Sequence, residues 1–174
     1  AVTVEAESEE EALERAKQHG VERATLARKA FASQAEYDSA MVELLRCHDI
    51  DVVVLAGFLS VLGPAMVQAF PNRILNVHPS LIPSFCGKGY YGLKVHEAAL
   101  ARGVKVTGAT VHLVNEITDG GPILLQKAVE VLPGDTAETL QHRVMEQAEW
   151  VLLPQATEMV CAAVTQQKKE NAGS

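Results

Sequence analysis

The stretch NVHPSLIPSFCGKGYYG, residues 76 to 92, places an amide and an imidazole two positions apart. Residues two apart on an extended strand point to the same face, so Asn76 and His78 project together, and Pro79 restricts the backbone directly after them. An amide can donate a hydrogen bond to an oxygen that gains negative charge, and an imidazole can exchange a proton near neutral pH. The pair has the chemistry that acyl transfer requires.

A carboxylate is still needed to orient the imidazole and to favour its charged form. Asp119, in the segment TDGGP, is the best candidate, because the two glycines after it let that loop approach a neighbouring strand end closely. Structural roles would also account for these residues: a histidine that only supports a turn, and a TDGGP segment that is an ordinary turn into a strand. Both interpretations stay open at this level.

Other side chains offer weaker alternatives. His112 lies inside an expected strand and fits a core position as well as a site position. The spacings of His78, His96 and His112 match no metal-ligand signature, so we expect no metal site. Cys86 could act as a nucleophile with His78 as its base, although only their proximity supports this. The glycine-rich GKGYYG matches no phosphate-binding motif and predicts a flexible surface loop.

Strand and helix patterns alternate along the chain without internal repeats. This alternation predicts an α/β fold with an open, mostly parallel twisted sheet flanked by helices. Chemistry in such sheets lies at the carboxyl ends of strands, where LAGF, NVHPS and NEITDGG would converge. The expected strands are 51–57, 73–78, 108–114 and 122–132, and the expected helices are 11–19, 35–47, 63–70, 93–103 and 135–153.

Capping and breaking residues mark the expected helix ends. Gly20 and Gly103 follow the last helical residues of two helices and predict their ends, and Pro154 is expected to restart or kink the last helix. Two pairs have the spacing of capping boxes: Ser8 with Glu11, and Asp135 with Glu138.

Length and composition are those of one globular domain, with 174 residues, of which 48% are apolar and 21% charged. No apolar run approaches the roughly 20 residues of a membrane span. The net charge of −7 argues against a nucleic-acid partner, since basic residues gather only in QQKKE near the end. Three widely spaced cysteines without a CxxC pair, and an acidic start unlike a secretory signal, favour a reducing cytoplasm.

Four stretches together resemble one enzyme family: LAGFLSVLGP, ILNVHPSLIPSF, KVTGATVHLVNEITDGGPILLQKAVEV and GDTAETLQHRV. The family is that of the glycinamide ribonucleotide transformylases, folate-dependent formyltransferases of purine synthesis with a Rossmann-like fold. The similarity runs from about residue 10 to about residue 160. The run GATVH with LQKAVEV favours this family over the related formyltetrahydrofolate hydrolase and tRNA formyltransferases.

The resemblance implies transfer of a formyl group from 10-formyltetrahydrofolate, as co-substrate, to the amine of glycinamide ribonucleotide. It assigns Asn76, His78 and Asp119 to catalysis. Asn76 and protonated His78 would stabilise charge on the formyl oxygen, and Asp119 would hold His78 and raise its pKa. No metal and no nucleophilic side chain is required.

The same matching implies where the two substrates would lie. Mostly apolar walls with backbone hydrogen bonds suit the flat pterin ring of the folate. On the ribonucleotide side, Pro79 would contact the substrate and the carboxylate of Glu149 would contact ribose hydroxyls. The implied folate-binding residues are Leu59, Ser60, Val61, Leu62, Asn76, Asn115, Glu116, Ile117, Thr118 and Asp119.

The start of the chain departs from the resembled family. Family members open with a strand and a Gly/Ser-rich loop that cradles the substrate phosphate, whereas AVTVEAESEEEALERA stands where the second strand and helix are expected. We therefore expect one formyltransferase-like domain over residues 1–174, N-terminally incomplete and impaired at the nucleotide site, with a flexible tail from about 166 to 174. Members also usually carry Arg at the position of Gln34, which can meet the folate tail. The loop CGKGYYGLKVH is longer than in several members, and the resemblance implies that it forms a flap beside the site.

Three functions follow as hypotheses. The favoured one is the cytoplasmic formyltransferase, a monomer or homodimer whose partners are glycinamide ribonucleotide and folate, with no nucleic acid and no membrane. A formyltetrahydrofolate hydrolase would share the same three catalytic residues and use water as the acceptor. A folate-binding protein without turnover is the third.

Overall fold

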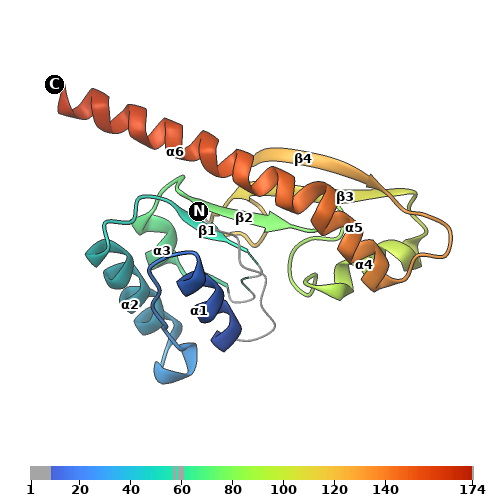
Figure 1. Cartoon of the computed structure of the whole chain (residues 1–174), viewed down its shortest axis with the longest axis horizontal. Helices are drawn as coiled ribbons and strands as arrows, with labels where there is room; N and C mark the ends of the chain where they lie inside the picture. Colours follow the sequence, from blue (N-terminus) through green and yellow to red (C-terminus); the bar gives the residue numbers. More distant parts are fainter. Residues whose placement is uncertain (1–8, 57, 59–60, 174) are drawn as a thin grey trace.

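A four-stranded sheet flanked by helices forms the centre of the molecule in a computed structural model that describes residues 9–56, 58 and 61–173 (Figure 1). Its strands lie side by side in chain order: β1 (Val53–Leu55), β2 (Ile74–His78), β3 (Val106–Leu113) and β4 (Ile123–Glu130). β1 and β2 are parallel, whereas β3 is antiparallel to both β2 and β4. The predicted open α/β sheet is confirmed, and the pairing of these strands is mixed rather than mostly parallel.

The predicted helices are present among the described residues. Gly20, two residues after α1, and Gly103, directly after α4, adopt left-handed backbone conformations, with φ of 66° and 74°, as expected of residues that end helices. The helices and short helical turns are α1 (Glu9–Gln18), η1 (Arg28–Ala30), α2 (Gln34–Cys47), α3 (Pro64–Ala69), α4 (Leu93–Arg102), α5 (Ala137–Val144), η2 (Met145–Glu149, a π-helical turn) and α6 (Trp150–Ala172).

Two details of the predicted caps change. The capping box of α5 is formed by Thr136 and Thr139, not by Asp135 and Glu138. The Asp135 carboxylate instead binds both terminal nitrogens of Arg143 at 2.6 Å, so it is not free to cap the helix. The other predicted box includes Ser8, which lies outside the described residues.

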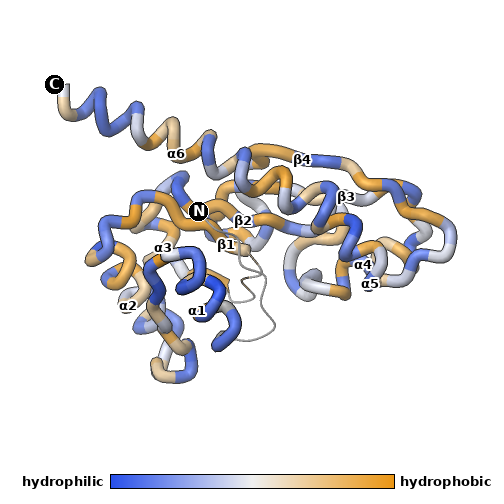
Figure 2. Tube along the Cα trace, in the orientation of Figure 1, coloured by the Kyte–Doolittle hydropathy of each residue, from blue (hydrophilic) through white to orange (hydrophobic). Residues whose placement is uncertain are grey.

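The last helix is more continuous than the sequence predicted. The irregular turn η2 precedes Pro154, and α6 runs through that proline to Ala172. Residues 166–172, expected as a tail, are helical and exposed, and Figure 2 shows this end of α6 to be polar. Within 9–56, 58 and 61–173, the structure contains no helix with the length and apolar character to cross a membrane.

Two apolar cores hold these elements together. In the larger one, α5, η2 and α6 pack against the sheet through buried Leu140, Val144 and Ala148. In the smaller one, α2 and α3 pack beside β1 and the start of β2, around Met66 and Ile74. Figure 1 shows α6 running along the sheet and α1, α2 and α3 grouped at its β1 end. Burial of each Leu, Val, Ile or Met side chain contributes roughly 1.5–3 kcal/mol, so both cores fix the strand ends that carry the site.

Candidate active site

A cavity of about 420 Å³ opens where β1 and β2 end. Its walls come from the ends of these strands, from the loop that follows β3, and from the glycine-rich segment 87–92. The three predicted catalytic residues, Asn76, His78 and Asp119, all line it. The structure therefore brings together side chains from separate parts of the chain.

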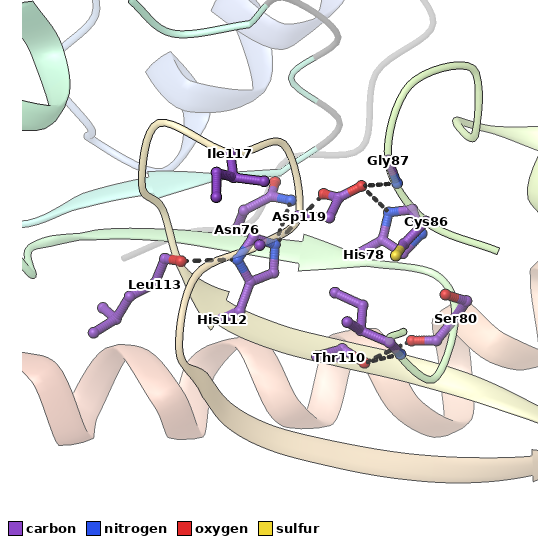
Figure 3. A network of polar contacts seen from close by, with 12 residues as sticks. Asn76, His78, Ser80, Cys86, Gly87, Thr110, His112, Leu113, Ile117 and Asp119 are labelled. Atoms are coloured by element: carbon purple, nitrogen blue, oxygen red, sulfur yellow. Dashed lines mark hydrogen bonds and ion pairs between the residues drawn. The ribbon is translucent and has the colours of Figure 1, made fainter. Parts of the chain in front are cut away.

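The imidazole of His78 is buried between two acceptors, of which Figure 3 labels Asp119. Its Nε2 lies 2.9 Å from the carbonyl oxygen of Phe85, and its Nδ1 lies 3.6 Å from Asp119 Oδ2. A carbonyl oxygen only accepts hydrogen bonds, so Nε2 carries a proton and Nδ1 faces the carboxylate. An imidazolium at His78 would have an acceptor for each of its two N–H groups.

A second histidine joins the network (Figure 3). His112 Nε2 lies 3.2 Å from Asn76 Nδ2 and 3.6 Å from Asp119 Oδ1, and its Nδ1 lies 2.9 Å from the Leu113 carbonyl oxygen. Because that carbonyl accepts a proton at Nδ1, a neutral His112 accepts from the Asn76 amide at Nε2. His112, which the sequence left open between core and site, is a member of the site network.

Asp119 is ionised at neutral pH in this arrangement. Burial raises its pKa, but the neighbouring His112 ring, the hydrogen bond from the Gly87 N–H and the adjacent His78 imidazole outweigh burial and hold the pKa below its usual range. The Gly87 N–H donates to Asp119 Oδ2 at 2.8 Å. The carboxylate thus links the loop after β3 to the glycine-rich segment.

The loop after β3 reaches the site by folding back. β3 is antiparallel to β2, so its last residue, Leu113, pairs with Leu75 rather than lying beyond His78. Asp119 has a left-handed φ of 54°, and a Cβ on Gly121 would lie only 1.8 Å from the Leu113 carbonyl oxygen. The expected close approach of the TDGGP loop is therefore correct, but the loop does not reach the site by following a parallel strand.

The turn after β2 is fixed to β3 by a buried hydroxyl. Thr110 Oγ1 donates to the Ser80 carbonyl oxygen at 2.6 Å and accepts from the Ile82 N–H at 3.1 Å. Ser80 Oγ in turn donates to the Ser84 carbonyl oxygen at 2.6 Å. These bonds set the path of the chain from His78 to Phe85, and hence the position of the Phe85 carbonyl.

The sequence model of the formyl transferase family matches residues 1–157 of the chain. The chain belongs to the formyl transferase family. Among curated relatives, the chloroplastic phosphoribosylglycinamide formyltransferase of Arabidopsis thaliana is 50% identical over 109 residues, which are 63% of this chain and 37% of the relative. The Escherichia coli phosphoribosylglycinamide formyltransferase is 42% identical over 135 residues, 78% of this chain and 61% of the relative.

Solved structures of the formyl transferase family share this fold. Glycinamide ribonucleotide transformylase 1 from Symbiobacterium toebii matches with a TM-score of 0.79 and 42% identity, over 88% of this chain and 68% of that one. The resemblance drawn from the sequence is confirmed. The chain spans less than two thirds of the length of both curated relatives described above.

Most residues assigned to substrate binding by family resemblance line the cavity. Val61 and Ile117 are exposed apolar residues in its wall, with 65% and 68% of their surfaces accessible. Leu59 and Ser60 lie outside the described residues. Glu149, at the last position of η2, is not among the described residues that line the cavity. The other lining residues from this set are Leu62, Asn76, Pro79, Asn115, Glu116, Thr118 and Asp119.

Two alternatives receive no support from the geometry. The Cys86 thiol donates to the Pro83 carbonyl oxygen at 3.3 Å, and burial together with the charge of Asp119 raises its pKa, which disfavours a nucleophilic thiolate. Among the described residues, no group of three His, Cys, Asp or Glu side chains could hold a metal ion. Gln34, the position at which the family usually has Arg, does not line the cavity. Its side-chain amide instead donates a hydrogen bond to Asp38 Oδ1 at 2.7 Å.

Local sequence patterns missed the contribution of the segment GKGYYG, which only the family resemblance placed beside the site, as a flap. Expected as a flexible surface loop, it supplies six consecutive lining residues, 87–92, and a direct bond to Asp119. Within the residues themselves, the only signal was its position between His78 and the helix at 93. Its closeness to the carboxylate depends on contacts between distant segments, which no local pattern reveals.

Proposed function

We propose that the chain transfers a formyl group from 10-formyltetrahydrofolate to the amine of glycinamide ribonucleotide, the formyl acceptor that the names of its relatives give. The observation that carries this proposal is the meeting of Asn76, His78 and Asp119 at one cavity, with the Asp119 carboxylate 3.6 Å from His78 Nδ1. An amide, a titratable imidazole and an ionised carboxylate are the groups that formyl transfer needs.

The proposed reaction proceeds through a tetrahedral intermediate. The substrate amine attacks the formyl carbon, and the C=O electron pair moves onto the oxygen, where Asn76 Nδ2 and an N–H of His78 stabilise the charge. The intermediate then collapses, the bond from carbon to folate N10 breaks, and the proton lost by the amine is returned to N10. The Nδ1 of His78 is the freer donor for the oxygen, since its 3.6 Å separation from Asp119 exceeds a normal hydrogen bond.

The cavity wall also suits the folate. Val61 and Ile117 present apolar surface to solvent at the cavity, and a flat pterin ring would cover them. Backbone groups of residues 115–119 would form hydrogen bonds with the polar edge of the pterin ring, as the family resemblance implies. Pro79 and Glu149 remain our proposals for the ribonucleotide side.

A comparison of the wild type with His78→Ala tests this function. We expect the wild type to form formylated glycinamide ribonucleotide, detected by mass spectrometry, and His78→Ala to lower kcat by roughly 10²–10³ because a donor to the charged oxygen is lost. His142→Ala is the matched control, since His142 is an exposed histidine on α5.

The same assay separates the competing functions. Formate released equally well without an amine acceptor would point to hydrolysis instead. Folate bound with no transfer and no hydrolysis would reduce the function to binding. Either result contradicts the proposed transferase.

We also propose a cytoplasmic monomer or homodimer. The cysteines Cys47, Cys86 and Cys161 are all free thiols, which suits a reducing compartment. Light scattering during size-exclusion chromatography would give the oligomeric state directly.

A further inference from the structure

The charges that line the cavity are unevenly distributed. Asp119 and Glu116 contribute two carboxylates. Across residues 9–56, 58 and 61–173, the only Lys or Arg among the lining residues is Lys88. A permanent cation in a wall with two acids is a feature that the catalytic trio does not explain.

The ammonium group of Lys88 is exposed and makes no hydrogen bond or ion pair with any other described residue. Lys94, two residues after the end of the glycine-rich segment, provides a contrast. Its Nζ bonds the Tyr91 hydroxyl at 2.7 Å and lies 4.3 Å from the centroid of that ring. One cation at this edge of the cavity is therefore already partnered, and the other is available to a ligand.

The backbone holds Lys88 beside the proposed catalytic centre. Gly87 and Gly89, on either side of it, have φ of 85° and 94°, left-handed conformations that favour glycine. The Gly87 N–H is bonded to Asp119 Oδ2 at 2.8 Å. Lys88 is thus one residue from a direct contact with the site carboxylate, and its flexible four-carbon stem can carry the charge to different points of the cavity.

We propose that Lys88 is a specificity residue that binds the anionic group of a substrate in this cavity. This inference rests on the proposed formyl transfer, whose two substrates each carry such a group: a phosphate on the ribonucleotide and carboxylates on the glutamate tail of the folate. An ammonium binds either oxyanion through charge-assisted hydrogen bonds. Without this positive charge, the neighbouring carboxylates of Glu116 and Asp119 would repel an anion in the cavity.

Steady-state kinetics of Lys88→Gln tests the proposal. Lys88 would bind ground state and transition state alike, so we expect KM for one substrate to rise about 10-fold with kcat nearly unchanged. Lys88→Arg, which keeps the charge, should restore most of the affinity. Lys105→Gln, which removes an exposed lysine outside the cavity lining, is the matched control and should leave both KM values unchanged.

Isothermal titration calorimetry identifies the substrate anion that Lys88 binds, and it does not require turnover. If the anion is the phosphate, Lys88→Gln weakens binding of glycinamide ribonucleotide and leaves folic acid unaffected. If the anion is the glutamate tail, the variant weakens binding of folic acid but not binding of pteroic acid, which lacks the glutamate. Higher ionic strength should weaken binding of the affected ligand more in the wild type than in Lys88→Gln.

The outcomes separate the two proposals. A wild type that binds these ligands but does not transfer formyl would refute the proposed function while leaving Lys88 testable by binding. Lys88→Gln with unchanged KM values and unchanged affinities would overturn the role of Lys88. A wild type that binds none of the three ligands would also overturn it.

Discussion

At the scale of single residues, His78 lies between two hydrogen-bond acceptors that come from different loops. The Phe85 carbonyl oxygen and the Asp119 carboxylate face opposite nitrogens of its ring, at 2.9 and 3.6 Å. Only 5% of His78 is exposed, so water competes little for either position. A positive charge on this ring would be held beside the proposed reacting carbonyl by groups that stay in place during the reaction.

A third histidine is buried outside the cavity lining. His96 is fully buried on α4, and neither ring nitrogen has a hydrogen-bond partner among the described residues. Burial, with a smaller contribution from the charge of His78, lowers its pKa to about 4. The folded protein therefore keeps this ring neutral at pH values where the unfolded chain has already bound a proton.

This difference predicts a loss of stability in weak acid. Between the folded pKa of about 4 and the ordinary value of 6.5, the unfolded state binds more protons, so the free energy of unfolding falls as pH is lowered. The loss from pH 7 to pH 5 that His96 causes should be about 2 kcal/mol. Urea unfolding of the wild type and of His96→Leu at both pH values measures it.

The His96→Leu variant should lose the histidine's share of this pH dependence, while the exposed His142→Leu variant keeps it. Replacing an unpartnered buried ring by an apolar side chain should cost little at pH 7. Equal pH dependence in the wild type and His96→Leu would show that His96 is not the group responsible.

At the scale of structural elements, the loop from Val114 to Gly121 determines where the Asp119 carboxylate lies. Inside it, the Ile117 N–H donates to Asn115 Oδ1 at 2.9 Å, and Asn115 Nδ2 donates to the Gly120 carbonyl oxygen at 3.3 Å. These bonds and the left-handed backbone of Asp119 fix the direction of its carboxylate. The loop is a positioning element whose shape depends on close backbone contact.

A methyl group at Gly121 should disturb that shape. In Gly121→Ala, the new Cβ would meet the Leu113 carbonyl oxygen at 1.8 Å, a contact that only a backbone shift can relieve. We expect a stability loss of roughly 1–3 kcal/mol and a lower kcat, because Asp119 moves with the loop. Thermal unfolding and formyl-transfer kinetics measure the two effects.

Gly173→Ala controls for the added methyl group, since its Cβ would make only an ordinary contact at 3.5 Å. Gly121→Ala with wild-type kcat would show that the loop can move without affecting the site.

Local patterns predicted the elements but not all of their pairings. The β-branched run around β2 and the amphipathic run of α2 are local features, and both elements formed where expected. The direction of β3 depends on which strand it pairs with, so the role of His112 opposite Asn76 could not be read from its own surroundings. The cap of α5 moved to Thr136 because Asp135 had a better partner in Arg143.

At the scale of the whole molecule, the site is an assembly of three segments. β2 supplies Asn76 and His78, the loop after β3 supplies Asp119, and the glycine-rich segment supplies the Gly87 N–H that fixes the carboxylate. The two apolar cores hold these segments in one arrangement, with β1 and β2 at the junction between them. The central claim is that His78 and Asp119 act as one unit within this assembly.

A double-mutant cycle of His78→Ala and Asp119→Asn on kcat for formyl transfer tests that claim most directly. If Asp119 acts through His78, each single change should lower kcat by roughly 10²–10³, and the double variant should be no slower than His78→Ala alone. Single-variant losses that multiply in the double variant would contradict the claim, because the two side chains would then contribute independently.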